Sequence, residues 1–332
     1  MKKHFFYFTC FFLALLLLSS CKKTGTIGIK IDNYSIGKAG EVILVLDQKY
    51  ASEAMLNYIV EVLTQPQPAL NQIEPIFDLL YFDNKDFTSY FQRHRNIVRF
   101  DMNPNYASNT FNIDDNVWTK PQTYVYLRGN DMDSLVWLFM QNEDEIINTL
   151  YNNDLKRVQS FAAAGNNDAF IEKKIKEKFD INITIPNTYK IAREEEDFMW
   201  LRFKTVRNDR FIVIYTTQGN DLSKKGLVNA RNEKTKAYIP GAVLGAYPVV
   251  ADVTPFPLYN SNVTIGGAIT GAELRGLWES VGDKMGGPFY EFSFNDRAGE
   301  NVISVGGFVY APEEEKRDYL REVEAIVKST KY

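Results

Sequence analysis

The chain has 332 residues, with 38 lysines and arginines against 42 aspartates and glutamates, a net charge of −4, and 45% hydrophobic residues. This composition excludes a wholly disordered chain, because there is enough apolar surface to build a core. The acidic balance disfavours nucleic acid as a partner, since phosphates require a basic surface, and no basic stripe in the sequence offsets it. We therefore expect no binding of nucleic acid.

The first 23 residues, MKKHFFYFTCFFLALLLLSSCKK, have the layout of an export signal. Two lysines precede the uncharged apolar run of residues 5–18, which is too short to span a bilayer because a spanning helix needs about 20 residues. Small residues then lead to Cys21. The pattern resembles the bacterial lipobox, in which residues 1–20 are removed and the cysteine thiol receives a diacylglycerol. A plain secretory signal and a short membrane anchor are the alternatives.

An acylated Cys21 implies a lipid bilayer as a partner of the chain. The diacylglyceryl group, usually joined in this class by an amide-linked third chain such as palmitate, reaches the two chains that stable anchoring requires. Cys10 leaves with the signal, so the mature chain has no cysteine pair for a disulfide. We expect a signal peptide over residues 1–20, a lipidated tether over residues 21–40 and a body stabilised by its hydrophobic core.

The body begins with alternating strand and helix patterns. The run EVILVLD at residues 41–47 is β-branched and apolar, as a central strand should be. Apolar residues at helical spacing predict a helix over residues 51–64. The other predictions for this half are strands at 77–82, 97–100 and 123–128, a short helical stretch at 85–92, and a polar loop with an edge strand at 103–121.

A longer helical pattern follows, with Asp131 or Asp133 as its N-cap. The polar run Asn152-Asn153-Asp154 predicts an interruption, after which a second helix continues to about Phe179. We place the boundary between two α+β units at this interruption. The N-terminal unit then covers residues 41–152 and the C-terminal unit covers residues 153–332.

His94 is the one histidine that remains once the signal is removed. A zinc site needs three or four cysteine, histidine or carboxylate ligands in a cluster that the sequence does not offer, so we expect no metal and no cofactor. His94 could act as a general base if a carboxylate oriented it. The favoured alternative is a partly exposed histidine between Arg93 and Arg95 at a strand edge.

The C-terminal unit contains an aromatic hairpin. Trp200 and Phe211, together with Phe203 and Tyr215, give it an apolar surface that another element must cover. The Pro- and Gly-rich residues 239–262 predict either a binding loop or a strap over the core. The remaining elements are predicted as strands at 197–205, 210–217, 290–294 and 302–310, a helix at 221–234, and a final helix that starts at Pro312.

The glycine-rich stretch Arg275–Phe289 is the candidate functional site. It combines an aromatic side chain, charged groups at near-helical spacing and free backbone amides, which together suit a lip that binds a ligand or partner. The residues of this candidate lip are Arg275, Trp278, Glu279, Asp283, Gly286 and Gly287. The alternative, which we favour, is a tight turn fixed by an Arg–Glu pair and a buried tryptophan. These glycines match neither a Walker A loop nor a dinucleotide fingerprint.

Six segments of the chain carry a family resemblance: Gly37–Val42, Gln65–Pro68, His94–Asn96, Arg275–Glu279, Gly282–Phe289 and Val309–Pro312. They resemble the family called domain of unknown function 4837, uncharacterised lipoproteins of diderm bacteria. The resemblance extends over nearly the whole mature chain and implies a cell-envelope location and a common fold, but no activity. Lys22–Gly25 lacks the acidic residues that follow the cysteine in surface-exposed lipoproteins of these bacteria. The resemblance therefore implies an outer-membrane location facing the periplasm.

We expect an α+β fold of two linked units, each a mainly antiparallel sheet with helices packed on one face. The similar segments Tyr50–Glu53 and Tyr310–Glu313 allow a duplication of one unit. The leading hypothesis is a membrane-anchored envelope lipoprotein that binds an unknown envelope protein or ligand without catalysis. The alternative is an envelope hydrolase with Glu279 and Asp283, or His94, as acid and base.

Overall fold

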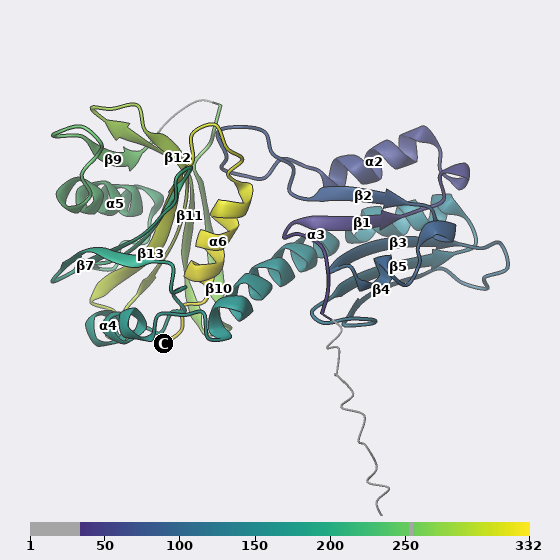
Figure 1. Cartoon of the computed structure of the whole chain (residues 1–332), viewed down its shortest axis with the longest axis horizontal. Coiled ribbons are helices and arrows are strands. Elements are labelled where there is room, and N and C mark those ends of the chain that lie inside the picture. The colour runs from purple at the N-terminus through teal and green to yellow at the C-terminus, as the bar shows by residue number, and fades with distance from the viewer. Residues whose placement is uncertain (1–33, 252–254) are drawn as a thin grey trace, which may run out of the picture. The chain divides into compact units, whose positions relative to one another are not determined.

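The computed structural model describes residues 34–251 and 255–332, and Figure 1 shows how their helices and strands are arranged. Tyr34–Tyr332 groups into one unit that contains two β-sheets. The predicted signal peptide, the lipidation site Cys21 and the larger part of the predicted tether lie outside the described residues.

The first sheet has five strands in the order β2-β1-β3-β5-β4. Neighbouring strands are parallel except for β4, which runs antiparallel to β5. The elements of this half are β1 (Glu41–Val45), α2 (Glu53–Leu63), β2 (Asp78–Phe82), β3 (Asn96–Met102), β4 (Thr110–Asp115), β5 (Thr123–Gly129) and α3 (Met132–Ala163), with short 3-10 helices at Gln48–Tyr50, Asn84–Asp86 and Phe91–Arg93.

Helices cover one face of this first sheet. Val42 and Leu44 of β1 point toward that face and pack with Ile59 of α2 and Phe139 of α3. The opposite face is covered by aromatic side chains from connecting segments, which form a smaller apolar cluster with Ile43. Residues 42–45 of β1 are buried on both faces of the sheet, which explains why these four positions are all apolar.

The second sheet is antiparallel throughout, in the order β10-β11-β12-β13-β8-β7-β6, with β9 paired to β11. Helices lie on both of its faces: α4 and α6 contribute to one apolar cluster and α5 to the other. The elements of this half are α4 (Ala169–Phe179), β6 (Lys190–Glu195), β7 (Phe198–Lys204), β8 (Asp209–Gln218), α5 (Lys224–Tyr238), β9 (Tyr247–Val250), β10 (Tyr259–Ile265), β11 (Ile269–Val281), β12 (Gly286–Asn295), β13 (Asn301–Tyr310) and α6 (Arg317–Lys328).

The α+β class and the presence of two sheet-containing halves are confirmed. The mainly antiparallel arrangement holds for the second sheet, whereas three of the four strand pairs in the first sheet are parallel. The prediction that helices pack on one face of each sheet is correct for the first sheet. The second sheet has helices on both faces, with α5 opposite α6. The two sheets differ in strand order and direction, so no duplication is seen between them.

Helix α3 overturns the predicted interruption at Asn152–Asp154. The helix runs from Met132 to Ala163 without a break, and Asp131 is its N-cap, accepting a hydrogen bond from the Ser134 amide at 2.8 Å. Asp154 stays helical because its buried carboxylate accepts hydrogen bonds from the Gly40 amide, Asn96 and Arg157. It therefore does not compete for the backbone amides of its own helix. A further prediction is wrong: α6 begins at Arg317, not at Pro312. Residues 181–185 contain an isolated bridge at Asn182.

The described end of the predicted tether, residues 34–40, is bonded to the body. The amide of Ile36 donates to the Arg93 carbonyl oxygen at 2.9 Å, and the amide of Gly40 donates to Asp154 Oδ2 at 2.7 Å. At these positions the predicted tether is therefore part of the folded body. None of the helices in the described part of the chain has both the length and the hydropathy needed to cross a membrane.

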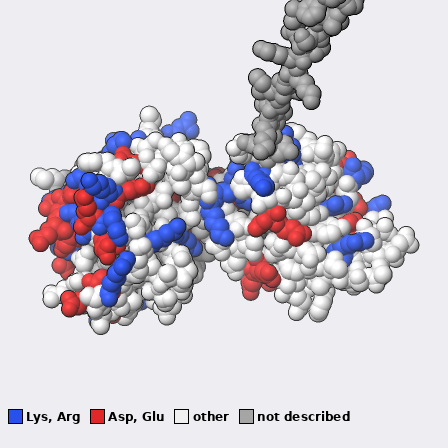
Figure 2. Space-filling view, turned by 90° about the horizontal axis from the view of Figure 1, so that it is seen from below, with Lys and Arg blue, Asp and Glu red and all other residues white. Residues whose placement is uncertain are grey.

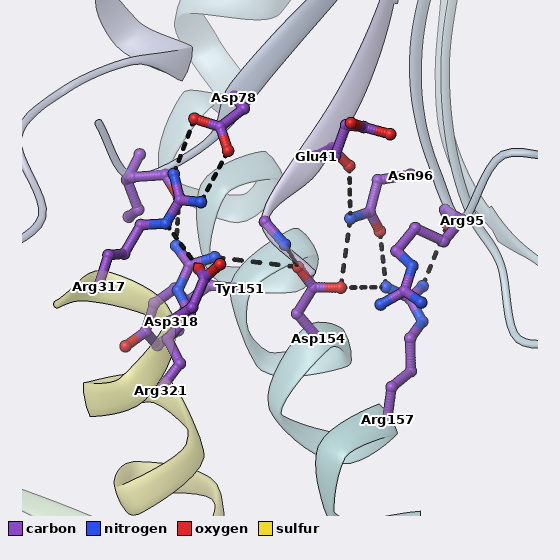
Figure 3. A network of polar contacts seen from close by, with 12 residues as sticks. Glu41, Asp78, Arg95, Asn96, Tyr151, Asp154, Arg157, Arg317, Asp318 and Arg321 are labelled. Carbon is purple, nitrogen blue, oxygen red and sulfur yellow. Dashed lines mark hydrogen bonds and ion pairs between the residues drawn. The ribbon is translucent and has the colours of Figure 1, made fainter. Parts of the chain in front are cut away.

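Figure 3 shows the buried polar network around Asp154. Its Oδ1 accepts hydrogen bonds from Asn96 Nδ2 at 3.3 Å and from Arg157 Nη1 at 2.5 Å. Arg321 of α6 approaches Asp154 Oδ2 to 4.0 Å and donates to the Ile76 carbonyl. The network therefore connects β3, the middle of α3 and α6, which come from distant parts of the chain.

Candidate functional site

The candidate lip lies on the hairpin of β11 and β12, so its residues occupy a strand, a turn and a second strand. Side chains alternate between the two faces of a strand, which means that residues at near-helical spacing do not share one face as they would on a helix. Trp278 and Leu274 belong to the apolar cluster of the face covered by α5. Arg275 contacts α6 on the opposite face.

Trp278 and Gly287 form one structural feature. The indole is 4% exposed, and its Nε1 donates a hydrogen bond to the Val309 carbonyl oxygen of β13 at 3.0 Å. Gly287 of β12 is the cross-strand partner of Trp278. A Cβ at Gly287 would collide with that carbonyl oxygen and lie 3.3 Å from Trp278 Nε1. Glycine is required there because the indole crosses β12 to reach β13.

Asp283 ties the turn of this hairpin to the segment that follows α5. Its Oδ1 accepts a hydrogen bond from the Met285 amide at 2.9 Å, and its Oδ2 accepts one from the Ala242 amide at 3.0 Å. Partial burial opposes ionisation, but these amide donors outweigh it and lower the pKa of the Asp283 carboxyl. Asp283 is therefore ionised at neutral pH and holds no proton for general-acid chemistry.

Arg275 is a buried ion-pair residue. Its Nη2 lies 3.0 Å from Glu324 Oε1 of α6 and its Nε lies 3.4 Å from Glu273 Oε1, while its guanidinium covers the Tyr290 ring. Glu279, which would supply the other half of an Arg–Glu pair within the turn, is exposed and lies opposite Gly286 across the hairpin. The partners of Arg275 are thus Glu273 of its own strand and Glu324, from the far end of the chain.

His94 is buried rather than partly exposed, which corrects the expectation for this residue. Its Nε2 lies 2.6 Å from Glu41 Oε1, and its Nδ1 lies 3.1 Å from the Asn96 carbonyl oxygen. A Cβ at Gly37 would collide with the imidazole ring. A carboxylate does orient His94, but the ring is enclosed by the packed start of the described chain.

A cavity of about 240 Å³ lies beside Trp278. Four aromatic side chains line it, and two of them, Phe211 and Phe308, stack with ring centroids 4.4 Å apart. The segment after α5 and the hairpin turn close it, held together by Asp283. The lining residues are Trp200, Arg202, Asp209, Phe211, Ile239, Pro240, Gly241, Ala242, Pro248, Trp278, Ser280, Met285 and Phe308.

Polar atoms without partners occur on four residues of this lining. Arg202 Nη2 donates to Asp209 Oδ2 at 2.7 Å. Among the described residues, no partner is found for the buried atoms Trp200 Nε1, Arg202 Nε, Asp209 Oδ1 and Ser280 Oγ. Unsatisfied buried polar atoms are rare in folded proteins and each costs about 1–3 kcal/mol. A ligand in this cavity would therefore lie close to polar atoms whose missing bonds it could supply.

A larger groove of about 700 Å³ runs along α3 and has a different character. Three lysines, Lys156, Lys328 and Lys331, line it together with hydroxyl and amide side chains, and its lining contains no aromatic residue. Lys328 is already paired with Glu324 at 2.8 Å. We therefore assign the candidate functional site to the aromatic cavity.

The cavity brings together parts of three sequence patterns. Trp278 comes from the candidate lip, Trp200 and Phe211 come from the aromatic hairpin, and Ile239–Ala242 comes from the Pro- and Gly-rich segment. Sequence reasoning missed Arg202 and Asp209. Their only signal is a pair of opposite charges flanking the turn of the β7–β8 hairpin, which is also common at ordinary surface turns. Within residues 34–251 and 255–332, no group of histidine, cysteine and carboxylate side chains is arranged to hold a metal ion.

Two family models match the chain. The model described as Domain of unknown function (DUF4837) matches residues 168–329, and the model described as Domain of unknown function (DUF8532) matches residues 35–162. The DUF4837 model therefore matches the second half of the chain, which carries the aromatic cavity. The family resemblance noted in the sequence is confirmed for this half, while a different family model describes the first half.

None of the curated proteins compared with the chain matches it. Among solved structures, the chain is similar to the Ran-binding protein Mog1p of Saccharomyces cerevisiae, with 9% identity and a TM-score of 0.29 over 46% of this chain and 89% of that one. LpqN of Mycobacterium tuberculosis, described as involved in cell envelope biogenesis, gives 12% identity and a TM-score of 0.28 over 45% and 81%. Human StAR-related lipid transfer protein 5 gives 14% identity and a TM-score of 0.20 over 51% of this chain and 97% of that one. These scores are too low to carry an argument about function.

The burial of Trp278 leads to a stability prediction. Substituting Trp278→Ala removes a buried ring and leaves the Val309 carbonyl without its donor, so we expect the free energy of unfolding to fall by about 3–5 kcal/mol. The matched control is Trp137→Ala on α3, where the side chain is 59% exposed and the expected change is within about 0.5 kcal/mol. Urea unfolding followed by circular dichroism measures both. Equal losses for the two variants would contradict the assigned burial.

The Arg275–Glu324 pair leads to a prediction of pH dependence. Burial opposes ionisation of Glu324, but Arg275 and Lys328 outweigh it and lower the pKa of the Glu324 carboxyl from 4.5 to about 2. A lowered pKa in the folded state stabilises the protein above the unfolded value, and this contribution is lost as pH falls from about 4.5 toward 2. We expect Glu324→Gln to be less stable than the unsubstituted protein at neutral pH, by about 3 kcal/mol or more.

The difference in stability between Glu324→Gln and the unsubstituted protein should shrink as pH falls below about 4.5. The control is Glu300→Gln, at an exposed turn position, whose effect should be small at every pH. Urea unfolding at a series of pH values measures these differences. A Glu324→Gln effect that stays constant down to pH 2 would show that this carboxylate is not held ionised by its partners.

Proposed function

We propose that the mature chain is a lipid-anchored protein of the cell envelope that binds a small ligand without catalysis, in the aromatic cavity beside Trp278. The observation that carries the binding proposal is the cavity itself: aromatic walls with a few polar groups, four atoms of which have no partner within the described chain. This combination is typical of sites for small molecules. The placement of the candidate acid and base residues gives no comparable support for a hydrolase.

The anchoring proposal depends on the sequence around Cys21, which supports attachment through an acylated cysteine. Lys22–Gly25, which contains no acidic residue, supports an outer-membrane location facing the periplasm. Figure 2 shows acidic as well as basic side chains on the face that it draws. This mixed surface fits a partner recognised by shape and apolar contact rather than by a single-sign electrostatic field.

Ligand binding is tested with two ring-sized probes, toluene and para-cresol. The protein is the full mature chain carrying Cys21→Ser, which needs no detergent, and binding is measured by NMR titration. We expect at least one probe to bind with a dissociation constant on the order of 0.1–1 mM, as a ligand of this size allows. Ser280→Phe places a ring inside the cavity and should abolish binding.

Ser108→Phe, at an exposed loop position that does not line the cavity, is the matched control and should bind as the unsubstituted protein does. If Ser280→Phe does not fold, as circular dichroism would show, Ala242→Phe at the exposed edge of the cavity replaces it. Undiminished binding by the folded cavity variant, or no binding of either probe to the unsubstituted cavity, would contradict the proposal.

The anchor is tested by fractionating cells that produce the full-length chain. We expect the unsubstituted protein in the membrane fraction and Cys21→Ser in the soluble fraction, because the substitution removes the thiol that carries the lipid. Cys10→Ser is the matched control and should remain in the membrane fraction, since residue 10 leaves with the signal. Retention of Cys21→Ser in the membrane, or an unmodified thiol at the mature terminus by mass spectrometry, would overturn the anchoring proposal.

A further inference from the structure

The size of the aromatic cavity limits its ligand to about one ring. Its volume of about 240 Å³ exceeds the roughly 150 Å³ of a protein cavity that accepts benzene. It falls below the roughly 300 Å³ at which pockets for drug-sized ligands begin. A single six-membered ring with small substituents fits between these limits.

The walls of the cavity favour a ring with apolar faces. Trp200, Phe211, Trp278 and Phe308 supply aromatic surface, and the Trp278 and Phe308 rings meet edge to face with centroids 5.0 Å apart. Ile239, Pro240, Pro248 and Met285 supply further apolar surface. Aromatic and aliphatic walls of this kind gain most from a flat ligand whose two faces need no hydrogen bonds.

The charges in the lining favour a neutral ligand. Arg202 and Asp209 are its only ionised residues, and they are paired with each other at 2.7 Å. A charged ligand would give up its hydration and find no unpaired opposite charge, which makes its transfer into the cavity unfavourable. A neutral ligand avoids that loss.

The unpartnered polar atoms favour one or two hydroxyl groups. Trp200 Nε1 and Arg202 Nε are donors, Asp209 Oδ1 is an acceptor and Ser280 Oγ can be either, and none of the four has a partner within the described chain. A hydroxyl group donates one hydrogen bond and accepts up to two, so a single hydroxyl can satisfy both kinds of atom. A sugar with several hydroxyl groups would leave most of them unpaired against the apolar walls.

The position of Arg202 provides access to these atoms. Trp200 Nε1, Arg202 Nε and Asp209 Oδ1 lie beneath the cavity wall, and the Arg202 side chain is 36% exposed. Binding requires Arg202 to turn far enough for Asp209 Oδ1 and the edge of Trp200 to border the cavity while its Nη2 stays bonded to Asp209 Oδ2, so that the two charges remain paired. Asp209 and Trp200 themselves are held by strands β8 and β7 and keep their places.

We propose that the cavity takes a neutral ligand with one flat ring and one or two hydroxyl groups, a phenol-like molecule whose hydroxyl bonds to Trp200 Nε1 and Asp209. This inference depends on the proposed function, because it names the class of ligand for the same site.

The test compares probes of nearly equal size on the full mature chain carrying Cys21→Ser. Para-cresol carries the hydroxyl, toluene lacks it, benzoate adds a negative charge and benzylamine a positive one; methyl glucopyranoside represents a sugar ring. We expect para-cresol to bind about tenfold more tightly than toluene, because the hydroxyl satisfies polar atoms that toluene leaves unpaired. The charged probes and the sugar should bind more weakly than para-cresol, also by about tenfold or more.

Trp200→Phe keeps an aromatic ring in the wall and removes the Nε1–H donor. We expect it to weaken para-cresol about fivefold and to leave toluene unchanged, a difference that a general loss of structure would not produce. Trp137→Phe, at an exposed position on α3, is the matched control and should change neither affinity.

The outcomes separate this inference from the proposed function. Equal binding of para-cresol and toluene, both blocked by Ser280→Phe, would overturn the hydroxyl inference and leave the cavity as the binding site. If the sugar or a charged probe bound more tightly than para-cresol, the proposed ligand class would be wrong, while the cavity would remain the binding site. Absence of binding by every probe would overturn the proposed function together with this inference.

Discussion

The buried carboxylate of Glu324 is the interaction on which the packing of helix α6 depends. Glu324 is fully buried and is held by Arg275 of β11, by Lys328 one turn along the same helix and by the hydroxyl of Tyr151 of α3. Removing one member of such a group leaves the others charged and unpaired in the interior, which costs more than the group contributes when complete. The arrangement therefore specifies a single position for α6 between the second sheet and α3, and the apolar face of α6 fills the core below it.

Strand β11 links this packing to the aromatic cavity. Because side chains alternate along a strand, the same segment directs Arg275 toward α6 and, on its other face, Trp278 and Ser280 toward the cavity. Gly287 lets the indole of Trp278 cross the neighbouring strand, and Asp283 fastens the segment after α5 over the opening. The cavity is thus built on a rigid sheet whose opposite face is fixed by α6, the kind of support that a preformed binding site requires.

The parts of the fold that the sequence predicts correctly are those that local physical chemistry decides. The apolar run of β1, the Asp131 cap of α3 and the aromatic hairpin of β7 and β8 each depend on residues close together in the chain. The predictions that failed depend on distant partners. Asp154 remains in a helix because Arg157, Asn96 and the Gly40 amide satisfy it, and His94 is buried because Glu41 lies against it.

The spacing of Arg275 and Glu279 was compatible with a helix, and only the pairing of β11 with β12 shows that it belongs to a strand. The sequence shows that the aromatic residues of the cavity must pack against another element. It does not show that they meet at one place, because that depends on the register of the second sheet.

The most direct test of the binding site is a crystal structure of the mature chain grown in the presence of para-cresol. We predict density for one ring between Trp200 and Trp278, with its hydroxyl within hydrogen-bond distance of Asp209 or of the Trp200 indole nitrogen, and with Arg202 turned aside. A cavity that stays empty in the presence of the probe, or one that is filled by its own lining side chains, would contradict the assignment of this cavity as the binding site.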